Sequence, residues 1–323
     1  MIDQEPTTPH VGTVHLLGAS GFVGKHVRLA LEAEGLVVTT HRAPRLRLGA
    51  RDVREVIAGI DDALVHDIRA WLHPGDVIVN VAGLIGGGDP DAFTGANALL
   101  PAALARTVAS TGSTRLVHVS SAAVQGSSRT LTAAGALSPF NGYSRSKALG
   151  ELAVQSLAPE AATCLRPASV HGRDRGVTRA VVALASSVAS TTLAPGTAST
   201  PQHHVENVAA AVRRLVTMAE NPPPVVLQPD EGFTTYNFLM LMSGGRRPHL
   251  APRRLGPLVS GLRGASARYL PVAGKQLRRL ELMLRGQDQE MSWLTEHGFT
   301  GPRRHEAWID MAEEVRAARR PYP

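Results

Sequence analysis

The sequence predicts an α/β fold, a doubly wound parallel sheet that carries a smaller C-terminal domain. Short apolar runs alternate with longer amphipathic stretches over the first two-thirds of the chain, and such alternation is typical of parallel sheets covered on both faces. The last third loses this rhythm, because proline and glycine interrupt it between residues 221 and 274. We expect a tail over 1–11, a larger domain over 12–170 that 203–228 rejoins, and a smaller domain from 171–202 and 229–323.

The order of the elements follows from the apolar runs. Strands are expected at 13–17, 36–40, 76–81, 115–120 and 163–165, with 225–227 as one more candidate. Helices are expected at about 91–110 and 143–157, and also between the first two strands. That first helix ends at Gly35, because a left-handed cap residue belongs there.

Composition excludes several classes of protein. Apolar residues make up 43% of the 323 residues and charged residues 19%, which favours a folded chain over a disordered one. The single cysteine, Cys164, excludes an internal disulfide and a cysteine-based zinc cluster, which suits the cytoplasm. No export signal or membrane-spanning run is recognisable, and we expect no membrane contact. The net charge of +7 is spread along the chain, which indicates anionic small molecules and no nucleic acid.

Three glycines with regular spacing follow the first strand. In a strand-to-helix turn Gly18 permits the bend, Gly21 lets the backbone approach a pyrophosphate, and Gly24 lets the helix pack closely. The alternative is a simple packing turn, since this spacing arises by chance about 0.3 times in such a chain. Its place between strand and helix favours a Rossmann dinucleotide-binding domain. We expect these residues to bind the cofactor: Gly18, Ser20, Gly21, Phe22, Val23 and Gly24.

The end of the second strand bears on which dinucleotide binds. An acidic residue there would accept hydrogen bonds from a ribose 2'-hydroxyl, but the chain offers Thr40, His41 and Arg42. Arg42 is a cation for a 2'-phosphate, so NADP is predicted and NAD stays possible. The alternative is that Arg42 is a solvated arginine in a basic loop with Arg45 and Arg47.

A tyrosine and a lysine lie four residues apart in the helix expected at 143–157. Tyr143 and Lys147 therefore share one face of that helix, although an ordinary surface pair has the same spacing. A free phenol titrates near pH 10, so we expect the lysine ammonium to lower its pKa. Ser121, at the end of the strand expected at 115–120, is a candidate hydrogen-bond partner of a substrate oxygen or a simple turn-former.

These motifs together resemble the extended short-chain dehydrogenase/reductase family, whose members include nucleotide-sugar epimerases, dehydratases and reductases. The resemblance covers about residues 12–215 and rests on GASGFVG, NVAG, Asn97, VSSAAVQG, YSRSK, LRPASVHG and HHVENVAAA, in that order. It implies that Tyr143 donates or accepts the proton and that Lys147 holds the nicotinamide ribose and lowers the phenol's pKa. It also implies that Ser121 orients the reacting oxygen. The implied cofactor contacts further include Ala82, Gly83, Asn97 and Pro167, with Pro167 near the carboxamide end.

Departures from the family pattern narrow the expected reaction. Ala122 and Ala123 follow Ser121 where many sugar dehydratases have an Asp-Glu pair, and Gln125 stands where many epimerases have tyrosine. We expect an NADP-dependent reductase of a keto group on a nucleotide-activated deoxysugar, acting as a homodimer. The alternatives are a nucleotide-sugar 4-epimerase with tightly bound NAD, a reductase of a non-sugar ketone, and a non-catalytic NADP-binding sensor.

The C-terminal third is expected to be the substrate domain. The segment from Arg253 to Arg285 contains eight basic residues and one acidic residue. Arginines such as Arg263, Arg268 or Arg278 are therefore candidates for binding a nucleotide diphosphate. The alternatives are a solvated surface and an amphipathic face for an anionic partner. Upstream, residues 173–175 either face the substrate or begin a helix. No metal site is expected, because adjacent His203 and His204 would point to opposite faces of a strand.

Overall fold

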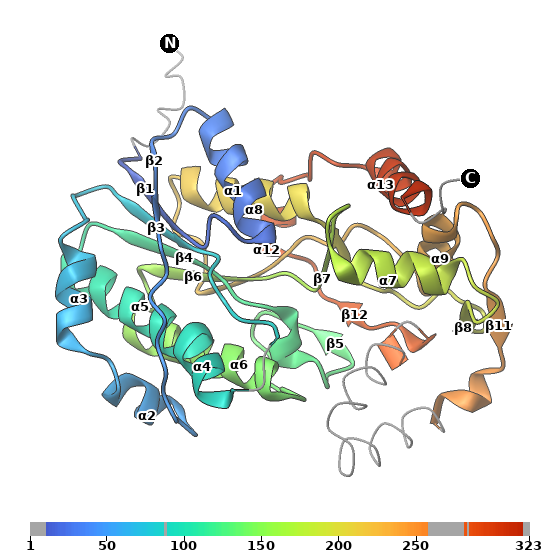
Figure 1. The fold of residues 1–323 in the computed structure, drawn as a ribbon, viewed down its shortest axis with the longest axis horizontal. Helices are drawn as coiled ribbons and strands as arrows, with labels where there is room; N and C mark the ends of the chain where they lie inside the picture. The colour runs from blue at the N-terminus through green and yellow to red at the C-terminus, as the bar shows by residue number, and fades with distance from the viewer. Residues whose placement is uncertain (1–10, 87–88, 258–280, 283, 319–323) are drawn as a thin grey trace.

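The computed structural model describes residues 11–86, 89–257, 281–282 and 284–318, and within them a parallel sheet dominates the fold (Figure 1). The sheet has six strands in the order β2-β1-β3-β4-β6-β10. Their bounds are Val14–Leu17 (β1), Val38–His41 (β2), Val77–Asn80 (β3), Arg115–Val119 (β4), Ala162–Arg166 (β6) and Val225–Leu227 (β10). The order reverses at β1, which is the switch point where doubly wound sheets bind ligands. The predicted fold class is confirmed.

Helices cover both faces of this sheet (Figure 1). On one face lie α1 (Phe22–Ala33) and α8 (Val205–Thr217), and on the other α2 (Val53–Ala58), α3 (Asp62–Arg69), α4 (Pro90–Thr94), α5 (Leu100–Thr111) and α6 (Gly142–Leu157). Alternate strand residues point to opposite faces, so Leu16 packs towards α1 and Leu17 towards α5. Because both faces are covered, the central strands β1 and β3 are buried throughout and mostly apolar, whereas β2 at the edge is mostly polar.

The helix predicted over 91–110 contains a π-helical turn. The five residues Gly95–Leu99 form this turn, η1, between α4 and α5. Pro101 explains the widening, since proline has no N–H to donate and its ring collides with the carbonyl four residues earlier, that of Asn97. The freed Asn97 carbonyl faces α6, where a Cβ on Gly150 would lie 2.0 Å from its oxygen. Gly150 therefore lets the two helices approach closely.

The short helices α2 and α3 were not predicted. Each begins at an aspartate whose carboxylate accepts a backbone hydrogen bond: Asp52 from Glu55 N at 3.0 Å and Asp61 from Ala63 N at 2.9 Å. Trp71, just after α3, packs on His15 of β1 and His41 of β2 and covers the sheet at its β2 edge. Helix α3 itself packs on α5.

A smaller part of the molecule lies beyond the carboxyl ends of the strands (Figure 1). Its elements are α7 (Gly176–Ala185), α9 (Thr235–Ser243), α13 (His305–Ala317) and the paired strands β8 (Thr191–Leu193) and β11 (His249–Ala251). The helices pack around Trp308, which is 1% exposed. The proposed domain boundaries stay a prediction.

Short elements join the two parts. They are η2 (Ala122–Gln125), β5 (Thr130–Leu131) with β12 (Asp288–Gln289), β7 (Ser169–His171) with β9 (Gln202–His204), η3 (Arg253–Leu255) and α12 (Trp293–Glu296). The candidate arginines Arg263, Arg268 and Arg278 lie outside the described residues. Among the described helices, none has the length and apolar character needed to span a bilayer.

Candidate active site

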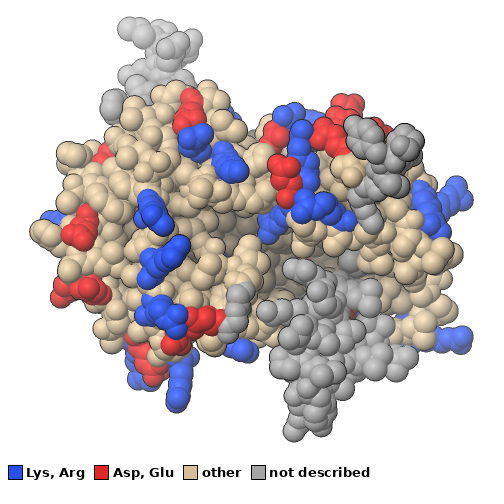
Figure 2. Space-filling model, in the orientation of Figure 1, with Lys and Arg blue, Asp and Glu red and all other residues tan. Residues whose placement is uncertain are grey.

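The residues singled out in the sequence gather at the carboxyl edge of the sheet. They follow β1, β2, β3, β4 and β6 or begin the helices next to these strand ends. Because all of these strands are parallel, their carboxyl ends meet on one side of the molecule, next to the smaller part. Figure 2 shows the surface hollowed between the two parts, with both basic and acidic side chains along its upper rim. The hollow suits a polar ligand.

The glycine turn after β1 is closed on two sides and open on the third. Gly18 has φ +87°, and a Cβ there would lie 2.6 Å from the backbone nitrogen of Ala82. A Cβ on Gly24 would lie 2.0 Å from the carbonyl oxygen of Gly18, so α1 packs tightly on the turn. Gly21 is exposed, and an added Cβ would meet only that same oxygen, at 3.2 Å. The bend at Gly18 and the close packing at Gly24 are as the spacing predicts, while the approach of Gly21 to a pyrophosphate stays a prediction.

Helix α1 presents unused donors at this turn. Gly21 is its N-cap residue, and no side chain caps it. Within the described part of the chain, the amides of Phe22, Val23 and Gly24 donate no hydrogen bond, and exposed Ser20 lies directly before them. Free amides at the positive end of a helix bind phosphate oxygens. The turn therefore fits the diphosphate of a dinucleotide.

Asn97 shapes the loop after β3 from behind. Its Nδ2 donates to the Leu84 carbonyl at 2.9 Å and to Ser146 Oγ at 3.0 Å, and its Oδ1 accepts from Leu84 N at 3.0 Å. Gly83 lies between Asn97 and the lysine, since an added Cβ would be 2.8 Å from Asn97 Oδ1 and 3.3 Å from Lys147 Nζ. The structure thus places Asn97 against protein atoms, where it holds the predicted cofactor residues Ala82 and Gly83.

Ser121 and Tyr143 meet at the end of β4. Ser121 begins η2 by accepting a hydrogen bond from Ala123 N at 3.1 Å, and its side chain lies near enough to Tyr143 to lower the pKa of the phenol. Tyr143 lies in the first turn of α6, which a capping box fixes: Asn141 Oδ1 accepts from Ser144 N at 2.8 Å and Ser144 Oγ from Asn141 N at 2.9 Å. The first turn of α6 is thereby fixed, and with it the position of Tyr143 near Ser121.

Lys147 lies one turn further along α6 and is buried. Its ammonium donates to the carbonyl oxygen of Val119 at 3.0 Å, the last residue of β4. An ammonium has three donors, and within the described residues this is the one acceptor that it finds. Its remaining donors suit ribose hydroxyls beside Gly83. Burial lowers the pKa of Lys147 to about 8, although Cys164 and Glu151 oppose that shift.

The phenol of Tyr143 is less acidic than the sequence predicts. Burial raises its pKa above 10, and this outweighs the hydrogen bond from Ser121 and the charge of Arg175, which both lower it. The prediction that Lys147 lowers this pKa is wrong, because the ammonium points to the Val119 carbonyl and is not among the groups that shift the phenol. Tyr143 therefore keeps its proton at neutral pH.

The end of β2 is fixed by ring stacking. His41 stacks on Trp71 with ring centroids 3.8 Å apart, and its Nε2 lies 2.9 Å from Nδ1 of His15. His15 in turn reaches Asp76 Oδ2 at 3.1 Å. Arg42, the next residue, is exposed. The predicted 2'-phosphate ligand therefore follows a rigid strand end.

Pro167 and the residues after β7 complete the edge. The Pro167 carbonyl accepts a hydrogen bond from Ala122 N at 2.8 Å, which ties the end of β6 to η2. The Arg175 guanidinium lies 4.9 Å from the ring centroid of Phe22, and its charge reaches Tyr143. A Cβ on Gly172 would lie 2.7 Å from that phenyl ring, so the segment packs closely on the start of α1.

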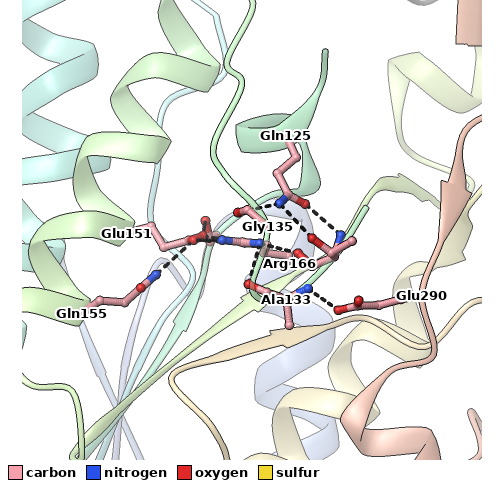
Figure 3. A network of polar contacts seen from close by, with 9 residues as sticks. Gln125, Ala133, Gly135, Glu151, Gln155, Arg166 and Glu290 are labelled. Carbon is pink, nitrogen blue, oxygen red and sulfur yellow. Dashed lines mark hydrogen bonds and ion pairs between the residues drawn. The ribbon is translucent and has the colours of Figure 1, made fainter. Parts of the chain in front are cut away.

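Sequence reasoning missed a buried ion pair behind these residues. Glu151 and Arg166 are 0% and 2% exposed, and Figure 3 shows their side chains meeting between α6 and β6. The sequence contains a signal for this pair, because a charged residue, Arg166, ends the apolar strand β6, and Glu151 follows Lys147 by one helical turn.

Comparisons with known proteins agree with this geometry. Among solved structures, an NADP-bound dTDP-4-dehydrorhamnose reductase from Bacillus anthracis matches with TM-score 0.59 and 15% identity, covering 96% of this chain and 99% of its own. A UDP-glucuronic acid 4-epimerase from Bacillus cereus with NAD matches with TM-score 0.62, 13% identity and coverages of 95% and 100%. A human epimerase family protein with NADPH matches with TM-score 0.60, 18% identity and coverages of 93% and 99%.

At these identities the similarity to solved structures shows the fold alone. A search of curated protein sequences found no relative. The sequence profile of the NAD dependent epimerase/dehydratase family matches residues 14–227, about two-thirds of the chain, and this span contains every residue of the site described above. The chain belongs to the NAD dependent epimerase/dehydratase family.

Proposed function

We propose that the protein is an NADP-dependent reductase of a keto group on a nucleotide-activated sugar, with Tyr143 as proton donor. The observation that carries the proposal is the gathering of Ser121, Tyr143 and buried Lys147 at the same edge of the sheet as the glycine turn. Membership of the family makes the chain an NAD(P)-dependent enzyme. The choice of reduction over epimerisation is based on Tyr143, and the choice of NADP over NAD on the end of β2.

The raised pKa of Tyr143 suits the direction of reduction. When bound, a nicotinamide cofactor supplies the hydride. As the substrate carbonyl carbon is reduced, its oxygen gains negative charge and takes the proton from the Tyr143 hydroxyl. A phenol that burial keeps protonated at neutral pH is ready to donate. Ser121 donates a hydrogen bond to the same oxygen and fixes its position, while Lys147 holds ribose hydroxyls beside Gly83.

The substrate class is supported by the relatives and by the hollow. The matched reductase and the matched epimerase both have names that specify nucleotide sugars. Lys and Arg side chains stand among Asp and Glu side chains on the rim of the hollow between the two parts, and the cations there are suited to a substrate diphosphate (Figure 2). Two of the three structures contain NADP or NADPH, and β2 ends without a carboxylate for a ribose hydroxyl.

Net oxidation of NADPH by a 4-keto nucleotide sugar is the direct test, and bound NAD without net turnover would indicate an epimerase.

Arg42→Ala is expected to weaken NADPH binding by about 10- to 100-fold, since a charge-assisted hydrogen bond contributes roughly 1.5–3 kcal/mol. NADH binding should hardly change, because NADH lacks the 2'-phosphate. Fluorescence titration with both cofactors measures this. Arg45→Ala is the matched control, since Arg45 is equally exposed three residues along. Equal losses for the two cofactors would remove Arg42 as the phosphate ligand.

The reaction is expected to slow as pH rises through about 8. Lys147 has its pKa lowered to about 8 and must be charged to hold its ligands, so the protonated fraction falls above that pH. The phenol, whose pKa is raised, still keeps its proton there. A pH profile of kcat with saturating NADPH measures the effect. A flat profile from pH 6 to 10 would contradict the role given to Lys147.

A further inference from the structure

We propose that the buried Glu151–Arg166 pair is a positioning unit that fixes Ser121 and Lys147 relative to each other and couples them to residues 287–290. The inference rests on the proposed function, because it concerns the same catalytic groups. Neither Glu151 nor Arg166 touches the reacting atoms in this proposal. Both act by positioning residues of the site that lie close to them.

The pair is fully hydrogen-bonded (Figure 3). Arg166 Nε donates to both carboxylate oxygens of Glu151, at 3.0 and 3.1 Å, and its Nη2 makes a further short contact with Oε1. The same carboxylate accepts from Ser120 Oγ at 2.7 Å and from Gln155 Nε2 at 3.2 Å. A buried network with every member satisfied is rigid, whereas one missing partner leaves an uncompensated charge.

Three members of the network lie close in sequence to a residue of the site. Ser120 precedes Ser121, Arg166 precedes Pro167, and Glu151 follows Lys147 by one turn of α6. The network therefore joins the ends of β4 and β6 to the helix that carries Tyr143 and Lys147. An apolar cluster of similar volume would fill the space as well, but it would not fix the angle between these elements as a bidentate pair does.

Arg166 also holds the loop between η2 and α6. Its Nη1 donates to the carbonyl oxygens of Thr132 at 2.8 Å and Ala133 at 3.3 Å. Gln125 grips the same loop, accepting from Thr132 N at 3.0 Å and donating to the Gly135 carbonyl at 2.9 Å. The loop connects the strand end with Ser121 to the helix with Tyr143. The guanidinium of Arg166 therefore holds the middle of the loop that connects Ser121 to Tyr143.

Residues 287–290 dock on this loop. Strand β12 pairs with β5, and Gln287 Nε2 donates to the Ser128 carbonyl at 2.8 Å. The carboxylate of Glu290 accepts a short hydrogen bond from Ala133 N (Figure 3). The carbonyl oxygen of the same residue, Ala133, accepts a hydrogen bond from Arg166 Nη1. A continuous chain of hydrogen bonds thus runs from Glu290 through Ala133 and Arg166 to Glu151.

Glu151→Gln tests the unit while keeping the shape of the side chain. We expect kcat to fall by about 10- to 100-fold, as for a small misplacement of reacting groups, with NADPH affinity nearly unchanged. The basic limb of the pH profile should also move to lower pH, by roughly half a unit or more, because the Glu151 charge supports protonated Lys147. Arg115→Lys is the control, since Arg115 begins β4 and donates to the Val216 and Met218 carbonyls at the opposite edge of the sheet.

The titration of Lys147 provides a readout without turnover. The chain has three lysines, so the side-chain ¹⁵N signal of Lys147 can be followed through pH in a lysine-labelled sample. A lower midpoint in Glu151→Gln supports the unit even if no sugar ketone is reduced, a result that would remove only the proposed reaction. An unchanged midpoint, or a kcat no lower than in Arg115→Lys, would overturn the inference.

Glu290→Gln tests the coupling from an exposed position that is safe for folding. We expect kcat to fall by roughly 3- to 10-fold at unchanged melting temperature, since one charged hydrogen bond to Ala133 weakens. Combined with Arg166→Lys, the effects on kcat should be less than additive in free energy, because both changes loosen the same chain of contacts. Additive effects would show that residues 287–290 act independently of Arg166 and would overturn the coupling.

Discussion

Tyr143→Phe is expected to lower kcat by about 10²- to 10⁴-fold, the range typical of a lost general acid, while leaving NADPH affinity nearly unchanged. The ring stays in place and only the hydroxyl that meets Ser121 is removed. Initial rates of NADPH oxidation and fluorescence titration separate the two quantities. If the proposal is right, the loss appears in kcat and kcat/KM alike, because the missing interaction exists only in the transition state.

Tyr236→Phe is the matched control for this change. Tyr236 lies in α9, in the smaller part, and loses the same atom. It should retain the activity of the unaltered chain. Activity retained in Tyr143→Phe would instead mean that another group donates the proton, and the pairing of Ser121 with Tyr143 would then be structural.

Gly18→Ala is expected to abolish NADPH binding and to lower the free energy of unfolding by about 3 kcal/mol or more. The left-handed backbone at φ +87° already disfavours a side chain, and the added Cβ would lie 2.6 Å from the backbone nitrogen of Ala82. Backbone atoms of β3's loop cannot move aside as a side chain can. The turn that presents the α1 amides must therefore shift.

Gly35→Ala separates the two causes. Gly35 has φ +80°, but no atom lies within 4 Å of an added Cβ. It should cost only the roughly 1–2 kcal/mol of left-handed strain and leave NADPH binding intact. Urea unfolding and cofactor titration of both variants provide the comparison. If the two variants behave alike, strain alone accounts for Gly18, and the close approach of Ala82 has no separate effect.

Local patterns were sufficient to predict the sheet and the glycine turn. Apolar runs identify buried strands because both faces are covered, and the glycine spacing reports the packing of Gly21 and Gly24 on Gly18 within one strand, turn and helix. Helices α2 and α3 were missed, being short, although their capping aspartates, Asp52 and Asp61, were a readable signal. Pro101 likewise marked the π turn in the sequence.

Properties that depend on distant segments were not predictable in the same way. The pKa of Tyr143 is governed by burial beneath residues far apart in the chain, so the helical spacing to Lys147 gave the wrong direction. The polar network joins residues 120, 151, 166 and 290, and no window of sequence contains it. The homodimer and the domain boundaries stay predictions.

The π turn at 95–99 has a consequence for comparing this chain with its relatives. A π turn contains an extra residue for the same rise, and each residue in a helix advances the phase by about 100°. A relative one residue shorter here would present a different side chain to Leu84, even with every neighbouring position matched. When such a relative is aligned with this chain, the position of the gap within this helix decides which asparagine corresponds to Asn97, more than residue identity does.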